Sequence, residues 1–337
     1  MRGARVRLLL LVRAAGALVA GLALVSACFA APPGRVVRVG LLYPISTDFD
    51  PAKNTFDREL VEGLRELGYQ PGRDVVFELR SAASVPSRLP GLAAELVAAK
   101  VDMLVAPATQ PVLAAAAATK TVPIIMVGTS DPVEIGLIAS LARPGGNVTG
   151  LAVNASETAA KRVELLREAV PGASRVAVLW NSSIRSMTLG FRMIEHASPA
   201  LGVTLQSVEV SDSAKFDQAF EAIARARPDG LIVLFGPLAG DDLPRIVQFV
   251  VKQRLPTIFE VGQGVRGGGL MEFGPSQSRM ARRAASYIDR IANGADPGTL
   301  PVEQPTVFEL TINLKAARAM GITIPQLLLV RADKVIE

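Results

Sequence analysis

Apolar and amphipathic segments alternate along most of this chain. The run Val36–Tyr43 is rich in β-branched residues and leucine, ends at Pro44, and is typical of a buried parallel strand. Thr55–Leu67 places its apolar residues three or four apart, as a helix does, and Gly68 follows it. Further strands are expected at Val75–Leu79, Val101–Ala106 and Pro123–Val127, and helices at Leu89–Lys100 and Val112–Lys120. These repeated units predict an α/β fold whose parallel sheet is covered on both faces.

The stretch Val127–Gly150 interrupts this alternation. It contains Pro144, Gly145 and Gly146, which neither a helix nor a central strand tolerates well. We interpret it as a crossing between two lobes, because the alternation starts again beyond it. Strands are then expected at Val148–Val153, Arg175–Trp180, Val203–Val210, Gly230–Phe235 and Pro256–Val261. Helices are expected at Glu157–Val170, Met187–Leu201, Lys215–Arg225 and Asp242–Arg254. A second glycine-rich break precedes the last of the expected helices, Met280–Asn293.

These breaks predict two lobes of similar size. We expect the first lobe at 36–148, with a return segment at about 265–305, and the second at 149–264, with a C-terminal segment at about 306–337. Two lobes joined by more than one extended crossing enclose a cleft, and ligands of open α/β sheets bind outside the carboxyl ends of the strands.

Net charge and the N-terminus indicate an exported protein. The 337 residues carry a formal charge of +5, but Arg2, Arg5, Arg7 and Arg13 account for all except about one unit, so no basic surface for nucleic acid is expected. A cationic start followed by a short apolar run predicts a signal peptide over residues 1–27. The single cysteine, Cys28, follows Val25-Ser26-Ala27 in an arrangement that resembles a bacterial lipobox. Either Cys28 is lipidated, or cleavage near Ala31 removes it.

The rule for strand ends selects a set of polar and flexible residues as ligand-binding candidates. Each lies at the end of an expected strand, shortly after one, or beside the second glycine-rich break: Ser46, Thr109, Gln110, Thr129, Ser130, Asp131, Asn154, Asn181, Phe235, Gly236, Glu260 and Glu272.

Every candidate also has a purely structural interpretation. Hydroxyls and free backbone N–H groups around Thr109 and Ser130 suit a carboxylate, or they cap local turns. Asp131 pairs with a ligand ammonium, or it makes a turn before Pro132. The amide of Asn181 can both donate and accept, although asparagine also forms turns, and Phe235 is a ligand wall or a core residue. A solvated carboxylate is the alternative for Glu260 and Glu272.

Several stretches of the sequence resemble a known family. They are GLRELGYQPGRDVVFELR (63–80), LPGLAAELVAAKVDMLVAPAT (89–109), VPIIMVGTSDPVEIGLIASLARPGGNVTGL (122–151), SRVAVLWN (174–181) and LPVEQPTVFELTINLKAARAMGITIP (300–325). Together they resemble the ABC-transporter substrate-binding proteins of the tryptophan/tyrosine type, with the two-lobed type I periplasmic-binding fold. The sequence departs from that family's usual residues at Pro107, Glu272 and Asn181-Ser182-Ser183.

The resemblance implies a monomer in the periplasm that binds a small, amino acid-like solute and delivers it to a membrane permease and its ATPase. A periplasmic sensor that signals to a membrane kinase and an exported enzyme that uses the same cleft remain as alternatives. The enzyme is disfavoured, because His196 is the only histidine and no P-loop or G-x-S-x-G motif occurs. We expect neither a cofactor nor a metal. Gly262–Gly267 matches the spacing of a dinucleotide fingerprint but is followed by Gly268-Gly269 rather than a helix, so it predicts a loop.

Overall fold

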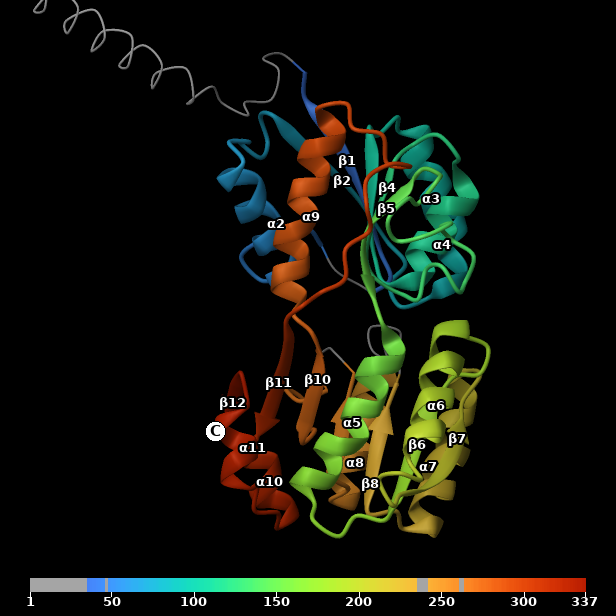
Figure 1. Ribbon diagram of the computed structural model, residues 1–337, viewed down its shortest axis with the longest axis vertical. Helices are drawn as coiled ribbons and strands as arrows, with labels where there is room; N and C mark the ends of the chain where they lie inside the picture. The colour runs from blue at the N-terminus through green and yellow to red at the C-terminus, as the bar shows by residue number, and fades with distance from the viewer. Residues whose placement is uncertain (1–34, 46–47, 235–241, 261–263) are drawn as a thin grey trace, which may run out of the picture. The chain divides into compact units, whose positions relative to one another are not determined.

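Strand pairing divides the chain between two sheets (Figure 1). The computed structural model describes residues 35–45, 48–234, 242–260 and 264–337. The first sheet, which defines the first lobe, is entirely parallel and has the order β2-β1-β3-β4-β5. Its strands are β1 (Val37–Tyr43), β2 (Val75–Ser81), β3 (Met103–Pro107), β4 (Ile124–Ser130) and β5 (Val148–Val153).

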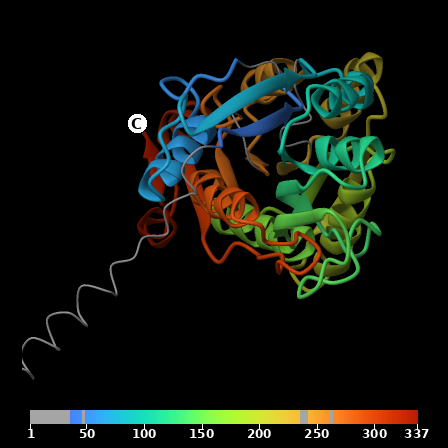
Figure 2. The ribbon, with the colours of Figure 1, turned by 90° about the horizontal axis from the view of Figure 1, so that it is seen from above.

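Helices cover both faces of this sheet. A short turn, η1 (Pro86–Arg88), leads into α3 (Leu89–Ala98), which packs with α4 (Thr109–Ala118) over one face. On the other face, α2 (Thr55–Glu66) lies beside α9 (Gln277–Ala292), as Figure 2 shows from above. The two helices approach closely because α2 has Gly63 at the contact, where an added Cβ would lie 2.8 Å from the carbonyl oxygen of Arg282.

A buried tyrosine–aspartate pair fixes the chain that follows β1. The Tyr43 hydroxyl donates to Asp57 Oδ1 at 2.6 Å, and the Asp50 N–H donates to Asp57 Oδ2 at 3.0 Å. Burial raises the pKa of both Tyr43 and Asp57 above their ordinary values. Because both carboxyl oxygens of Asp57 are bonded, the first turn of α2 holds the residues that lead out of the strand.

The second sheet, which defines the second lobe, has the order β12-β11-β10-β9-β8-β6-β7. We predicted a parallel sheet here as well, but β10 runs antiparallel to β11. The chain leaves this sheet through β10 to form α9 and returns through β11, so these neighbouring strands run in opposite directions. The strands are β6 (Arg175–Trp180), β7 (Thr204–Glu209), β8 (Gly230–Val233), β9 (Thr257–Phe259), β10 (Met271–Pro275), β11 (Phe308–Asn313) and β12 (Lys334–Ile336).

The core of the second lobe lies between its sheet and the surrounding helices. Trp180 stacks on Phe191 with ring centroids 4.5 Å apart, and the stacked rings of Phe220 and Phe249 join α7 to α8. The helical elements are α5 (Ala155–Ala169), α6 (Arg185–Ala197), η2 (Ser213–Lys215), α7 (Phe216–Ala226), α8 (Leu243–Gln253), α10 (Leu314–Met320) and α11 (Gln326–Val330).

The borders between the sheets differ from the predicted ones. We expected Val148–Val153 to begin the second lobe, but this strand pairs with β4 and closes the first sheet. The glycine- and proline-rich stretch before it is not a crossing. It folds back on the first lobe, where Ile138 is buried in the core and the Gly145 N–H donates to the Gly298 carbonyl at 3.0 Å. At the other border, 271–275 belongs to the second sheet rather than to a return segment that begins at 265.

Three crossings therefore connect the sheets. Asn154 alone separates β5 from α5, Ser276 alone separates β10 from α9, and the chain returns between α9 and β11. The first two crossings begin at the carboxyl ends of β5 and β10. The chain therefore passes between the lobes at the strand ends where ligands of α/β sheets bind.

We predict that Gly150→Ala strongly destabilises the protein. Gly150 has φ +124°, and an added Cβ would lie 2.3 Å from the Met126 carbonyl oxygen in the paired strand. Denaturant unfolding should show a loss of about 2 kcal/mol or more. Gly146→Ala is the matched control, because nothing lies within 4 Å of its added Cβ. Equal stabilities of the two variants would contradict the close approach of β4 and β5.

Candidate functional site

The carboxyl ends of β3 and β4 bring two predicted residues together. Thr109 begins α4 directly after β3, and Ser130 ends β4. The Ser130 N–H donates to Thr109 Oγ1 at 3.2 Å, so the threonine hydroxyl joins two strand ends instead of capping its own helix. Ser130 and Gln110 are half-buried. The first turn of α4 is the positive end of the helix dipole, which makes this edge suited to an anionic group.

The backbone at this edge is strained at Ala108. This residue has φ 68° and ψ 168°, a region that only glycine normally occupies. Its N–H donates to the Val127 carbonyl at 2.9 Å, which ties the strained residue to the neighbouring strand. The conformation of Ala108 therefore sets the direction in which α4 leaves the sheet. The strained residue lies at the strand ends where the sequence predicted ligand binding.

Thr129 and Asp131 flank Ser130, and only Thr129 differs from it in burial. Thr129 follows a bulge at Gly128 and is fully buried, and its hydroxyl has no hydrogen-bond partner among the described residues. Asp131 is half-buried, has φ 46°, and its N–H donates to the Val153 carbonyl at 3.1 Å. Of the three neighbouring candidates, Ser130 and Asp131 are partly exposed, whereas Thr129 points into the lobe.

Two predicted asparagines belong to the second lobe. Asn154 lies where the chain enters this lobe, and Asn181 lies at the end of a strand. Asn154 occupies the crossing from β5 to α5, where its carbonyl accepts from the Thr158 hydroxyl at 3.3 Å. Asn181 follows β6, and its Oδ1 accepts from the Ser183 N–H at 2.9 Å and from the Ser183 hydroxyl at 2.6 Å. The turn that we considered as the alternative for Asn181 is therefore present.

The sequence predicted Glu260 at the carboxyl end of β9 but missed its charged partner, Arg162. Glu260 follows this strand, and its carboxylate lies 3.7 Å from Nη2 of Arg162 on α5. The Arg162 side chain is only 2% exposed, whereas that of Glu260 is 26% exposed. Burial lowers the pKa of Arg162 and raises that of Glu260, and the attraction between the two opposite charges opposes both shifts. Arg162 was detectable in the sequence, because it falls in the apolar stripe of α5 with Ala159, Val163 and Leu166.

The remaining predicted residues are less informative. Glu272 lies on β10, is half-buried, and pairs in register with Phe259 of β9 and Thr311 of β11. Ser46, Phe235, Gly236, Cys28 and the expected signal peptide lie outside the described residues. Within those residues, no three histidine, cysteine or acidic side chains are grouped to hold a metal ion, and no helix has the length and apolar character needed to cross a membrane.

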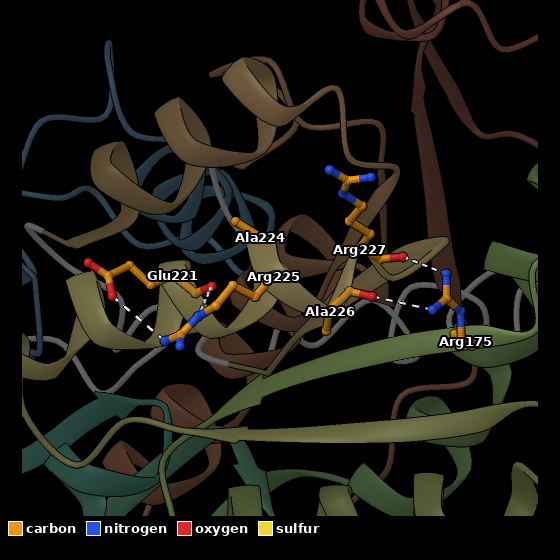
Figure 3. Close-up of a pocket in the computed structure, with 6 residues that line it drawn as sticks. All are labelled: Arg175, Glu221, Ala224, Arg225, Ala226 and Arg227. Carbon is orange, nitrogen blue, oxygen red and sulfur yellow. Dashed lines mark hydrogen bonds and ion pairs between the residues drawn. The ribbon is translucent and has the colours of Figure 1, made fainter.

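A cavity of about 900 Å³ lies at the opposite end of the second sheet (Figure 3). Its lining includes Arg175, which begins β6, and the last turn of α7. The Arg175 guanidinium points at this turn and donates to the carbonyls of Ala226 at 3.3 Å and Arg227 at 2.9 Å (Figure 3). Arg175 thus caps the C-terminus of α7, and the cavity is separate from the strand ends that carry the candidate site.

Comparison with known proteins identifies relatives over most of the chain. A family model described as ABC transporter substrate binding protein matches residues 39–336. A tyrosine-binding protein of Clostridioides difficile is 26% identical over 271 residues, which are 80% of this chain and 76% of that protein.

Solved structures show the same fold. A conserved domain protein from Vibrio cholerae has a TM-score of 0.81 and 26% identity, with 89% of this chain and 100% of that chain covered. A Streptococcus pneumoniae ABC domain in complex with L-Trp has a TM-score of 0.80 and 24% identity, with 90% of this chain and 100% of that chain covered.

We predict that Ala108→Gly stabilises the protein by about 1 kcal/mol, because glycine adopts the strained φ and ψ without a steric penalty. Ala117→Gly is the matched control. Ala117 is exposed near the end of α4, where the same substitution should cost about 0.5–1 kcal/mol. Both are measured by urea unfolding. A loss of stability in Ala108→Gly comparable to that of the control would contradict a strained strand end.

Proposed function

The chain belongs to the family of ABC transporter substrate-binding proteins, and on that premise we propose that it is the extracytoplasmic solute receptor of an ABC importer. It captures a small polar, amino acid-like solute between its lobes and delivers the solute to a membrane permease driven by a separate ATPase. Its predicted signal peptide over residues 1–27 directs export, and Cys28 is the residue at which a lipid anchor would be attached.

The observation that carries this proposal is the position of the polar strand ends relative to the crossings. Thr109, Gln110, Ser130 and Asp131 lie at the carboxyl edge of the first sheet, and Glu260 lies at the carboxyl edge of the second. Two crossings leave these same edges, through Asn154 and Ser276. A solute that touches both edges makes contacts in a closed arrangement that it does not make in an open one, and this difference in affinity drives closure.

The third crossing has the features of a hinge. On the first-lobe side, the Glu303 N–H donates to the Gly150 carbonyl at 2.9 Å, and the Glu303 carboxylate accepts from Arg283 at 2.7 Å. On the second-lobe side, the Ser276 N–H donates to the Val307 carbonyl at 3.1 Å. Only residues 304–306 lie between these anchored points. A change in the backbone angles of so short a segment reorients one lobe without breaking the bonds on either side.

The two edges differ in the charge that they favour. The first turn of α4 and the Ser130 hydroxyl favour a carboxylate, and the Glu260 carboxylate favours an ammonium. An amino acid carries both groups. This agrees with relatives that are described as a tyrosine-binding protein and as a domain in complex with L-Trp.

We predict that an amino acid stabilises the exported protein against heat. In a thermal-shift screen of amino acids, aromatic acids and other small metabolites, a solute at a hundredfold excess over its dissociation constant adds about 2.7 kcal/mol of stability. Calorimetry on Ser130→Ala should then show affinity reduced by about tenfold, because one hydrogen bond to a charged group is lost.

Ser286→Ala is the control for this variant, because Ser286 is a half-buried residue on α9 whose hydroxyl donates to the Arg283 carbonyl of the same helix. Affinity that is unchanged in Ser130→Ala would contradict the proposed site but not the function. No stabilisation by any solute of the panel would contradict the function itself.

A further inference from the structure

We infer that two copies of this chain associate through β2, the edge strand of the first sheet. The two strands pair antiparallel, with Leu79 on the twofold axis. The inference goes beyond solute binding, and it differs from the monomer that the family resemblance implies. Its basis is a row of backbone groups that face away from the sheet, together with charges that match in one register.

β2 is the longest free sheet edge in the described part of the chain. The edge at β5 is occupied, because the Glu303 N–H donates to the Gly150 carbonyl and the Ala152 N–H donates to the Glu303 carbonyl, both at 2.9 Å. Of the other edge strands, β12 has three residues, β7 has six and β2 has seven. A long edge strand without a cover is a template for pairing with another chain.

A hydrogen bond at the end of β2 shows which of its backbone groups face outward. The Ala82 N–H donates to the Tyr43 carbonyl of β1 at 2.9 Å. Ala82 and every second residue before it therefore turn their backbone groups toward β1. Backbone groups of successive residues in a strand point in opposite directions, so those of Phe77, Leu79 and Ser81 turn away from the sheet.

A twofold axis at Leu79 lets these outward groups bond to one another. In this register Leu79 faces its own counterpart, and Phe77 faces Ser81 of the second copy. Each facing pair exchanges two N–H···O bonds, which gives about six across the interface. The pairing ends before Val75, whose carbonyl already accepts from the Gly72 N–H at 2.7 Å.

The charged residues of β2 match in this register. Glu78 forms an ion pair with Arg38 at 2.9 Å. Arg80 lies on the same face of the strand and forms an ion pair with Glu95 of α3 at 2.7 Å. With the axis at Leu79, Glu78 of each copy lies opposite Arg80 of the other, so the charges alternate in sign across the interface. A register centred on Glu78 would instead place two glutamates opposite each other.

The other long edge, β7, offers no such match. Its sequence is TLQSVE, in which Glu209 is the only charged residue, so two copies of β7 cannot pair opposite charges. β2 also presents apolar surface on its second face, where Phe77 and Leu79 are half-buried. The ring of Phe49 lies 4.5 Å from that of Phe77 and extends this surface.

Arg80 also has a purely structural interpretation, as a residue that protects the edge. Its Nη1 donates to the Leu79 carbonyl at 2.9 Å, so the side chain lies along the outward face of the strand. A carbonyl oxygen has two lone pairs, and that of Leu79 can accept a second bond without losing the first. The two roles differ in sign, because removal of a protecting residue strengthens association, whereas removal of a matching charge weakens it.

Sedimentation equilibrium of the exported protein, from about 1 to 500 µM, measures the association. We expect a dimer with a dissociation constant in the micromolar range, because one edge strand buries less surface than a standard interface. Leu79→Pro removes an outward N–H but not the bonds to β1, so it should weaken the dimer about tenfold or more. Leu79→Ala is the matched control, since it shortens the same side chain and keeps the N–H.

Two charge variants test the register, and they also decide the matter if Leu79→Pro does not fold. Glu78→Lys and Arg80→Glu each place like charges opposite each other, so each variant alone should associate about tenfold more weakly than the wild type. An equimolar mixture of the two should recover the dimer, because opposite charges then face each other at both positions. Glu209→Lys, on the other long edge, is the control and should associate as the wild type does.

Several results would overturn the inference. They are a wild-type protein that stays monomeric at every concentration, a dimer that survives in Leu79→Pro, a mixture of the charge variants that does not associate, and an Arg80→Glu variant that associates more strongly than the wild type. Protection of the β2 amides from hydrogen exchange only when a different protein is added would have the same consequence.

Solute binding is measured separately on the same variants. β1 separates β2 from β3 and β4, which carry the predicted solute contacts of the first lobe, so the variants should bind a solute with wild-type affinity. A dimer that binds no solute of a broad panel would overturn the proposed function and support the inference. A monomer that binds a solute would do the reverse.

Discussion

The parallel pairing of β5 with β4 is the constraint on which the arrangement of the candidate site depends. The two backbones approach closely at Gly150, where a side chain would collide with the Met126 carbonyl. This pairing carries β5 to the same edge as the ends of β3 and β4, and only Asn154 then separates it from α5. The chain therefore enters the second lobe from the edge at which Thr109 and Ser130 meet, and the connection between the lobes and the polar strand ends coincide.

Backbone strain at that edge has a structural cause. Ala108 and Asp131 both have positive φ values, although neither is a glycine, and each donates its N–H to the carbonyl of a residue in the next strand. The ladder of the sheet holds these residues in conformations that they would not adopt alone. Such strain is most often found at sites that bind or switch, because the geometry of the site outweighs the local cost.

Two carboxylates, one buried and one partly exposed, have different roles. Asp57 accepts hydrogen bonds from the Tyr43 hydroxyl and the Asp50 N–H, so both of its oxygens are used inside the first lobe. Glu260 has a partner at 3.7 Å, too far for a hydrogen bond, and part of its side chain remains exposed. The first carboxylate stabilises a turn, whereas the second retains hydrogen-bonding capacity at a strand end.

Much of this protein is determined by its sequence alone. Alternating apolar runs and helical stripes predict the elements, because burial of an apolar face requires a period that local sequence displays. The α/β class, the two lobes and the strand ends that carry the candidate residues follow from that pattern, and the motifs place the chain in its family.

Tertiary structure decided which sheet each strand joins and which polar groups meet. Val148–Val153 has the same local pattern wherever it pairs, so only its hydrogen bonds to β4 reveal that it belongs to the first lobe. Likewise, Ser130 lies 21 residues from Thr109 and Glu260 lies 98 residues from Arg162, and no local period relates them. Contacts between segments distant in the sequence arise from strand order, which is a property of the folded chain.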